Sequence, residues 1–214
     1  MFMNLIPLTV PVRLRGNIYC LPPVKHVVKM TLIDLLVRRA KRKYSKKYKL
    51  IITLLGIIFF AVLVPAAIIY TSLALDAMLR LGLPLEPYNI VLGLVLIIAS
   101  ISFAAWALWC QWNIGKGTPV PVAPTQKLIV TGPYAYCRNP MVFGVLLYYL
   151  GLVLAVGSLM GLGVVFIFGV LASMYVKFVE EKELELRFGD EYVEYEKNTP
   201  FVIPRPRRLR QAKG

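Results

Sequence analysis

The chain has 214 residues, 58% of them hydrophobic, and a mean hydropathy of +0.66. These values exclude an ordinary soluble domain, whose surface needs more polar side chains, and they indicate a membrane protein. The formal net charge is +14, but the cations gather beside apolar runs, which favours a cationic membrane surface over nucleic-acid binding.

The N-terminal segment, residues 1–49, is strongly basic. It holds twelve Lys and Arg residues and one acid, which gives it a charge of about +11. Residues 1–23 have no small-residue cleavage pattern, so we expect no secretory signal there. Residues 24–48 place apolar side chains near one face, which predicts an interfacial amphipathic helix; a disordered basic tether is the alternative. We interpret His26, the only histidine, as an interfacial residue.

Two long uncharged runs follow. Leu50 to Leu75 is long enough to cross a hydrocarbon core of about 30 Å, and we expect Pro65 to kink this helix without ending it. Breakers in 76–87 separate it from a second run, Tyr88 to Trp112. The sequence therefore predicts two transmembrane helices in residues 50–112.

A third apolar stretch, residues 141–178, carries one charge, Lys177. Gly157-Ser158 near its middle predicts a turn between two short helices, so that the stretch forms a helical hairpin. Five glycines in this hairpin predict close helix packing: Gly144, Gly151, Gly161, Gly163 and Gly169. The fold class is thus an all-α integral membrane protein with about four transmembrane helices.

The charges outside these helices predict the orientation. Residues 1–49 and the loop 113–140 are cationic, whereas the connector 76–87 has one Arg and two acids, so both termini are expected in the cytoplasm. After the hairpin, a charged helix is predicted to about Lys197, followed by a basic tail at 205–214. We divide the chain at these points into 1–49, 50–112, a region 113–204 and the tail.

The three cysteines predict no disulfide framework or metal site. Cys20, Cys110 and Cys137 are odd in number, lack CxxC spacing and have no nearby His, so we expect reduced thiols and no bound metal.

Two polar clusters flank the hairpin, and both are expected at its cytoplasmic end. The first is the segment 131–140, and the second begins at Glu180-Glu181 and continues to Tyr195. Alone, each could be a set of turns or a solvated charged face, with Lys177 as a surface ion-pair partner. Together they provide a guanidinium for a carboxylate, carboxylates for an ammonium and tyrosines that can face a cation. A zwitterionic ligand with a sulfonium fits these groups.

The motifs G-P-Y-x-Y-x-R-N-P at 132–140 and E-E-x-x-L-x-x-x-F-G-x-x-Y-x-x-Y at 180–195 resemble one family. Residues 113–204 are similar to the catalytic region of the isoprenylcysteine carboxyl methyltransferases and their phospholipid-methyltransferase relatives. The resemblance implies methyl transfer from S-adenosylmethionine to a lipophilic membrane substrate. The carboxylate of a prenylated cysteine is the first candidate acceptor, and a phospholipid amine or a thiol is the alternative.

The resemblance also implies roles for residues. Arg138 would bind the anionic end of cofactor or substrate, and Glu181 would support Glu180 or orient substrate. Ten residues would line or hold the cofactor: Gln126, Lys127, Leu128, Ile129, Tyr134, Asn139, Pro140, Met141, Val142 and Glu180.

One departure bears on the chemistry. The family commonly has Arg-His-Pro where this chain has Arg138-Asn139-Pro140, and an Asn side chain cannot take up a proton. A carboxylate acceptor needs no base, whereas an ammonium acceptor must first lose a proton. Two other classes stay open: an NADPH-dependent membrane reductase and a non-enzymatic basic membrane anchor.

Overall fold

A computed structural model describes residues 10–14, 17–21, 44–84, 86–118 and 125–205. The chain divides into two compact units, 1–31 and 32–214. Residues 24–43 of the predicted amphipathic helix lie outside the described residues.

The described part of the first unit is a β-hairpin. Strands β1 (Val10–Leu14) and β2 (Asn17–Leu21) pair antiparallel, with Val12 opposite Tyr19. The sequence pattern indicates helices alone, so this hairpin is an addition to the expected all-α fold. Its residues are rich in Val, Ile and Leu, which suit a strand, but the run is too short for its pattern to separate strand from helix.

The second unit begins with one long helix that contains a π turn. Helix α2 (Lys46–Ile58) starts at the Ser45 cap, whose hydroxyl accepts the N–H of Tyr48. It continues through the π-helical turn Phe59–Leu63 into α3 (Val64–Leu79). The predicted span at 50–75 is therefore part of a longer helix, and Pro65 does not end it.

The hydrogen bonds around Pro65 explain the π turn. Pro65 has no N–H to donate, so a carbonyl one turn earlier loses its partner. Two tyrosines from a later helix supply the donors instead. Tyr149 Oη donates to the Phe60 carbonyl at 2.8 Å, and Tyr148 Oη donates to the Ala61 carbonyl at 3.2 Å. Neighbouring side chains thus satisfy the backbone that Pro65 leaves open, as a membrane interior requires.

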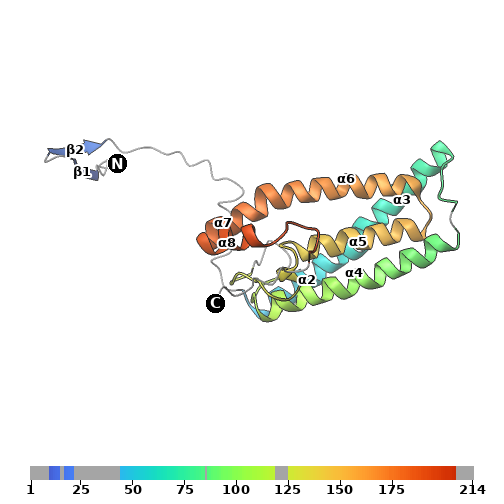
Figure 1. The fold of residues 1–214 in the computed structure, drawn as a ribbon, viewed down its shortest axis with the longest axis horizontal. Coiled ribbons are helices and arrows are strands. Elements are labelled where there is room, and N and C mark those ends of the chain that lie inside the picture. Colours follow the sequence, from blue (N-terminus) through green and yellow to red (C-terminus); the bar gives the residue numbers. More distant parts are fainter. Residues whose placement is uncertain (1–9, 15–16, 22–43, 85, 119–124, 206–214) are drawn as a thin grey trace, which may run out of the picture. The chain divides into compact units, whose positions relative to one another are not determined.

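The remaining long helices are α4 (Tyr88–Asn113), α5 (Pro140–Ala155) and α6 (Leu159–Tyr175). Helix α4 packs along α5, while α3 packs against α6 and more briefly against α5 (Figure 1). The turn between α5 and α6 falls at Gly157, where φ is +69°, and Ser158 caps α6, which confirms the predicted hairpin.

Three helices of the described chain are long and apolar enough to cross a membrane: 46–79, 88–113 and 159–188. Helix α5 has 16 residues, a length of about 24 Å at 1.5 Å per residue, and is shorter than a hydrocarbon core. The structure thus supports an integral membrane protein with three spanning helices and one shorter apolar helix.

Glycines bring α4 and α5 close together. A Cβ added to Gly93 would lie 2.6 Å from the carbonyl oxygen of Gly151, and one added to Gly151 would lie 2.9 Å from that of Gly93. The close packing predicted for Gly151 is therefore present. Gly163 differs, because a Cβ there would meet no atom within 4 Å.

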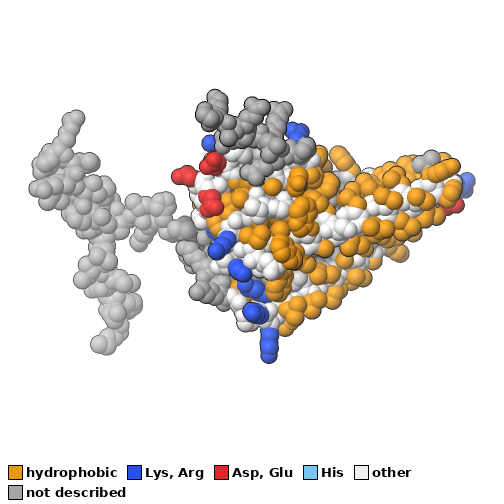
Figure 2. All heavy atoms as spheres, turned by 60° about the horizontal axis from the view of Figure 1, so that its bottom comes forward, with side chains coloured by type: hydrophobic (Ala, Val, Ile, Leu, Met, Phe, Trp, Pro, Cys, Tyr) orange, Lys and Arg blue, Asp and Glu red, His pale blue; other side chains and the backbone are white. Residues whose placement is uncertain are grey.

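One end of the helices carries most of the described charge. After α6, a π turn (Val176–Glu180) leads into α7 (Glu181–Phe188), and α8 (Asp190–Asn198) follows. The sequence predicted one helix to about Lys197, but Gly189 (φ +55°, ψ −130°) separates two helices. Figure 2 shows hydrophobic side chains over the long helices and charged side chains gathered at the α7–α8 end.

Candidate functional site

The two polar clusters meet at this charged end. The first lies in a 3₁₀ turn (Gly132–Ala135) and the residues up to α5. Its Arg138 N–H donates to the Pro200 carbonyl at 2.8 Å, and both the N–H and the side-chain amide of Asn139 donate to the Phe201 carbonyl. The chain that follows α8 is thereby fixed along the first cluster.

Arg138 is the centre of the site's polar contacts. Its side chain is 9% exposed and donates to Glu181 Oε1 at 2.8 Å, to Glu196 Oε1 at 3.3 Å and to the carbonyls of Glu196 and Thr199. Four of the five guanidinium N–H groups therefore have acceptors within the protein. Arg138 therefore links the segment before α5 to α7 and α8.

Lys177 completes this network. Its ammonium lies 2.7 Å from Glu181 Oε2 and 2.8 Å from Glu196 Oε1. The Lys177 ammonium holds the pKa of Glu196 below its usual value. Both oxygens of Glu181, which is 4% exposed, are thus paired with cations. Glu181 is occupied within the protein.

Glu180 differs from its neighbour Glu181. It is the last residue of the π turn, is half-buried, and has no hydrogen bond or ion pair in the part of the chain that the structure describes. The charge that acts on it most is another acid, Glu183. A π turn adds a residue to the helical repeat, so α7 starts in a different register from α6. The two adjacent acids have different surroundings: Glu181 is paired with two cations, and Glu180 has no ion pair among the described residues.

Tyr134 is a buried residue on which the charge of Glu180 acts. Its ring packs with Ala107, Cys110 and Ile129, and only 9% of the residue is exposed. Its carbonyl accepts the hydroxyl of Tyr195 at 2.6 Å, but its own hydroxyl has no hydrogen-bond partner. Burial raises the pKa of the Tyr134 hydroxyl, and the negative charge of Glu180 adds to that rise.

Residues 125–129 lead up to the first cluster. The guanidinium of Arg187 in α7 donates to the Thr125 carbonyl and lies 2.7 Å from Glu183 Oε1. The N–H of Gln126 donates to the Gly115 carbonyl at 2.6 Å. Arg187 therefore ties α7 to the start of the segment that the family resemblance assigns to the cofactor.

The predicted site residues fall into three groups in the structure. Glu180 has no hydrogen bond or ion pair among the described residues and its charge acts on Tyr134, while Arg138, Glu181 and Asn139 are engaged within the protein. The others line the 125–129 segment and the first turn of α5: Gln126 and Lys127 (exposed), Leu128, Met141 and Val142 (half-buried), and Ile129 and Pro140 (buried). Their roles toward a cofactor stay predictions.

Sequence reasoning missed two contributors. Glu196 and Arg187 belong to the charged stretch that follows the hairpin. No spacing in the sequence links Glu196 to Arg138 or Arg187 to Thr125. Within the described residues, no three His, Cys, Asp or Glu side chains gather as a metal site would require.

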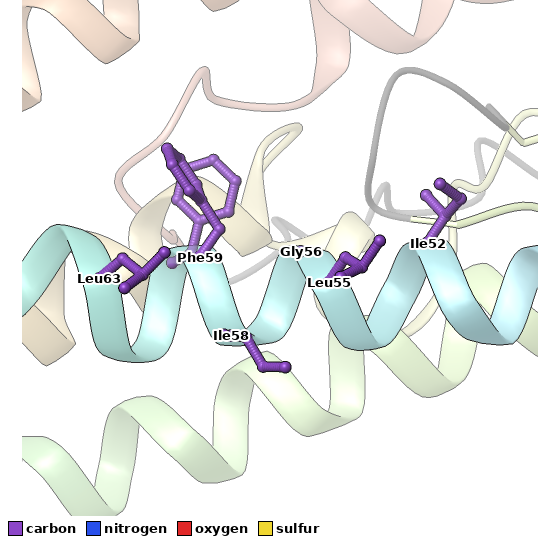
Figure 3. Close-up of a pocket in the computed structure, with 7 residues that line it drawn as sticks. Ile52, Leu55, Gly56, Ile58, Phe59 and Leu63 are labelled. Atoms are coloured by element: carbon purple, nitrogen blue, oxygen red, sulfur yellow. The ribbon is translucent and has the colours of Figure 1, made fainter.

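An apolar groove of about 420 Å³ runs along α2 and the π turn that follows it. Figure 3 shows Ile52, Leu55, Phe59 and Leu63 on the side of the helix that lines it. Among the described elements, only the π turn that directly follows α2 packs extensively against it. The side of α2 that lines the groove is therefore not covered by another helix. The groove suits an aliphatic chain.

The fold is that of an integral membrane protein with a network of charged and polar side chains at one end of its helices. Residues 88–191, slightly under half of the chain, match the family model described as Phospholipid methyltransferase. No curated protein matches the chain. The matched region includes α4, α5, α6 and the double Glu, so this part of the chain is similar to the family of membrane methyltransferases that the motifs resemble.

Proposed function

We propose that this protein transfers a methyl group from S-adenosylmethionine to a lipophilic acceptor held in the membrane. The observation that carries the proposal is the half-buried carboxylate of Glu180, which has no hydrogen bond or ion pair among the described residues and whose charge acts on the buried hydroxyl of Tyr134. A buried acid without a cation is costly, and a ligand ammonium would remove that cost.

The residues present fit this cofactor. Glu180 would bind its ammonium, and Tyr134 would offer a hydrogen bond and a ring face toward positive charge. When bound, S-adenosylmethionine supplies a methyl on a sulfonium; the S–CH₃ bond breaks as the bond to the acceptor heteroatom forms, and the electron pair stays on sulfur. The surrounding apolar cluster at Ala107, Cys110 and Ile129 would keep water out, which favours a transfer that removes positive charge from sulfur.

Arg138 and Glu181 would act as positioning residues. Their pair joins the residues before α5 to α7, and Lys177 holds the second oxygen of Glu181. This arrangement would fix Glu180, the preceding residue, where its ligand binds. We infer this role because the four hydrogen bonds of Arg138 leave little of its guanidinium for an anionic ligand.

The acceptor would come from the bilayer. The apolar groove along α2 would hold the aliphatic chain of a prenylated cysteine or of a phospholipid. Asn139 supplies no base, and its amide is bound to the Phe201 carbonyl, so a carboxylate acceptor, already a nucleophile, needs nothing further from this position. The positive-inside rule supports a cytoplasmic location for the site and both termini.

Calorimetry of the purified protein with S-adenosylhomocysteine and with NADPH tests the proposal. We expect binding of the first only, and loss of that binding in Glu180→Gln with the melting temperature unchanged. Glu191→Gln, an exposed acid of α8, is the matched control and should bind normally. Binding of NADPH alone would support the reductase, and binding of neither would support the anchor.

The acceptor requires a second experiment. Native lipid extract and prenylcysteine analogues would be incubated with the protein and radiolabelled S-adenosylmethionine. Label in a prenylcysteine ester that mild alkali removes would identify a carboxylate acceptor, and alkali-stable label in a phospholipid headgroup would identify an amine.

A further inference from the structure

The apolar groove along α2 leads to polar groups at the N-terminal end of that helix. Lys49, Thr53 and Gly56 follow one another at spacings of four and three residues, so they share one face of α2. Gly56 lines the groove, and so does Ile52, which directly precedes Thr53 (Figure 3). Along this face an apolar groove is therefore followed by a hydroxyl and then by an ammonium group, an order that suits an amphipathic ligand.

The hydroxyl of Thr53 is buried without a hydrogen bond. The residue is 4% exposed, and its Oγ1 has no partner in the described part of the chain. Thr71 of α3, by contrast, donates its hydroxyl to the Ala67 carbonyl of the preceding turn at 2.8 Å. Buried polar atoms of native proteins are nearly always paired, so the Thr53 hydroxyl lacks an acceptor that a ligand could supply.

Lys49 is a cation that no acid neutralises. Its ammonium donates to the Lys116 carbonyl in the loop after α4, which leaves two of its three N–H groups for other acceptors. Lys49 has no ion pair with any residue that the structure describes, and the first turn of α2 holds no acid. The N-terminus of a helix carries partial positive charge, so a cation there is unfavourable. A bound anion would offset both charges.

The surroundings of the groove are those of a lipid. The groove belongs to the helix 46–79, which is apolar enough to cross a membrane, and its side of α2 is not covered by another described helix. Lysines at the end of such a helix lie at the headgroup level, because the hydrocarbon core disfavours their charge. Figure 2 shows Lys and Arg side chains in a row where the hydrophobic surface ends. Lipid phosphates lie at the same depth.

We propose that Lys49 and Thr53 bind the phosphate of an anionic phospholipid whose acyl chain lies in the groove. The ammonium supplies opposite charge and the hydroxyl a hydrogen bond. The exposed Lys46, three residues before Lys49, adds a second cation that repels a headgroup ammonium, so the site favours a headgroup without one. The inference goes beyond the proposed function, because this lipid has no amine to methylate. It would occupy the groove when no acceptor chain does.

Lipid titration of the purified full-length protein tests this site. Native mass spectrometry in detergent would measure the affinities of phosphatidylglycerol and of phosphatidylcholine with the same acyl chains, and the wild-type protein should prefer phosphatidylglycerol. Lys49→Gln should weaken phosphatidylglycerol about 10-fold, the size of a hydrogen bond to a charged group, and remove most of the preference. Thr53→Val keeps the shape of the side chain without its hydroxyl and should weaken both lipids about 5-fold.

Two further variants separate the headgroup from the chain and from general surface charge. Lys47→Gln makes the same charge change in the same turn, but Lys47 is exposed and, two residues before Lys49, lies on another face of the helix. Both affinities should therefore stay close to the wild-type values. Gly56→Leu adds a side chain to the groove and should weaken both lipids while the preference for phosphatidylglycerol persists.

Each contrary outcome is specific. Equal weakening by Lys47→Gln and Lys49→Gln would overturn the inference, because general surface charge would then explain the binding. Equal wild-type affinities for the two lipids, or unchanged affinities in Gly56→Leu, would overturn it as well. A wild-type dimer that Gly56→Leu dissociates would instead assign the groove to a second copy of the chain.

The proposed function is tested separately on the same variant. Lys49→Gln should bind S-adenosylhomocysteine with the wild-type affinity in calorimetry. A wild-type protein that prefers phosphatidylglycerol but does not bind S-adenosylhomocysteine would refute methyl transfer and leave the lipid site standing.

Discussion

Arg138 and Glu181 form a buried ion pair, with 2.8 Å between Nε and Oε1, although the whole α5–α6 hairpin separates them in sequence. Their side chains are 9% and 5% exposed. This contact joins the two motifs that the sequence shows only as separate clusters.

Breaking this pair should destabilise the protein strongly. Arg138→Met leaves Glu181 buried with Lys177 as its only cation, and such losses cost about 3–5 kcal/mol. Arg138→Met with Glu181→Leu should cost less than the sum of the two single changes, because neither charge is left alone. Chemical denaturation in detergent measures both, with exposed Arg205→Met as the control. A loss of less than about 1 kcal/mol in the free energy of unfolding of Arg138→Met would contradict the burial of this ion pair.

Tyr149→Phe tests the hydrogen bonds around Pro65. The change removes the donor to the Phe60 carbonyl and should cost about 1–3 kcal/mol, because that carbonyl is left unpaired in an apolar setting. In a Pro65→Ala background, an N–H becomes available to the preceding turn, and the cost of Tyr149→Phe should fall. Equal costs in the two backgrounds would show that the tyrosine does not replace the missing N–H of Pro65.

Asp76 supports the opposite end of the helices. Its carboxylate accepts the Ser158 hydroxyl and, at 3.0 Å, the N–H of Met160 in the first turn of α6. Asp76→Ala should lower the free energy of unfolding by about 1–3 kcal/mol, as loss of a buried cap does. Ligand affinity, measured by calorimetry with S-adenosylhomocysteine, should stay unchanged since the site is at the other end. Exposed Glu86→Ala serves as the control, and a selective loss of affinity in Asp76→Ala would argue against a purely structural role.

Arg187 is expected to position the segment 125–129. Arg187→Met removes the hydrogen bond to the Thr125 carbonyl and the ion pair with Glu183. We expect about a 10-fold rise in KM for S-adenosylmethionine, the size of one lost hydrogen bond, with a smaller change in kcat. Arg187→Lys should recover part of the affinity because it keeps one charged donor. Equal falls in kcat for both variants at unchanged KM would refute this role.

Cys137 should resist alkylation in the folded protein. Burial raises the pKa of its thiol to about 11, so at pH 8 roughly one thiol in a thousand is ionised. Iodoacetamide followed by peptide mass spectrometry should modify Cys137 only after unfolding. Because the unfolded thiol ionises at lower pH than the folded one, the stability linked to the neutral thiol should fall as pH rises from about 9 to 11. Rapid labelling of native protein at pH 8 would show that the thiol is accessible.

The sequence by itself determined the features that depend on local composition. The length of the uncharged runs indicated the helices at 50–75 and 88–112. Gly157-Ser158 indicated the turn of the hairpin, because glycine permits the positive φ and serine caps the next helix. The order of the motifs also indicated the resemblance to a family whose model matches residues 88–191.

Only the tertiary structure decided how the polar residues are used. Glu180 and Glu181 are chemically identical neighbours in the sequence, yet one meets Arg138 and Lys177 while the other meets no cation among the described residues. That difference depends on Arg138, which the fold brings from the segment before α5. Such long-range contacts leave no periodic signal in the sequence.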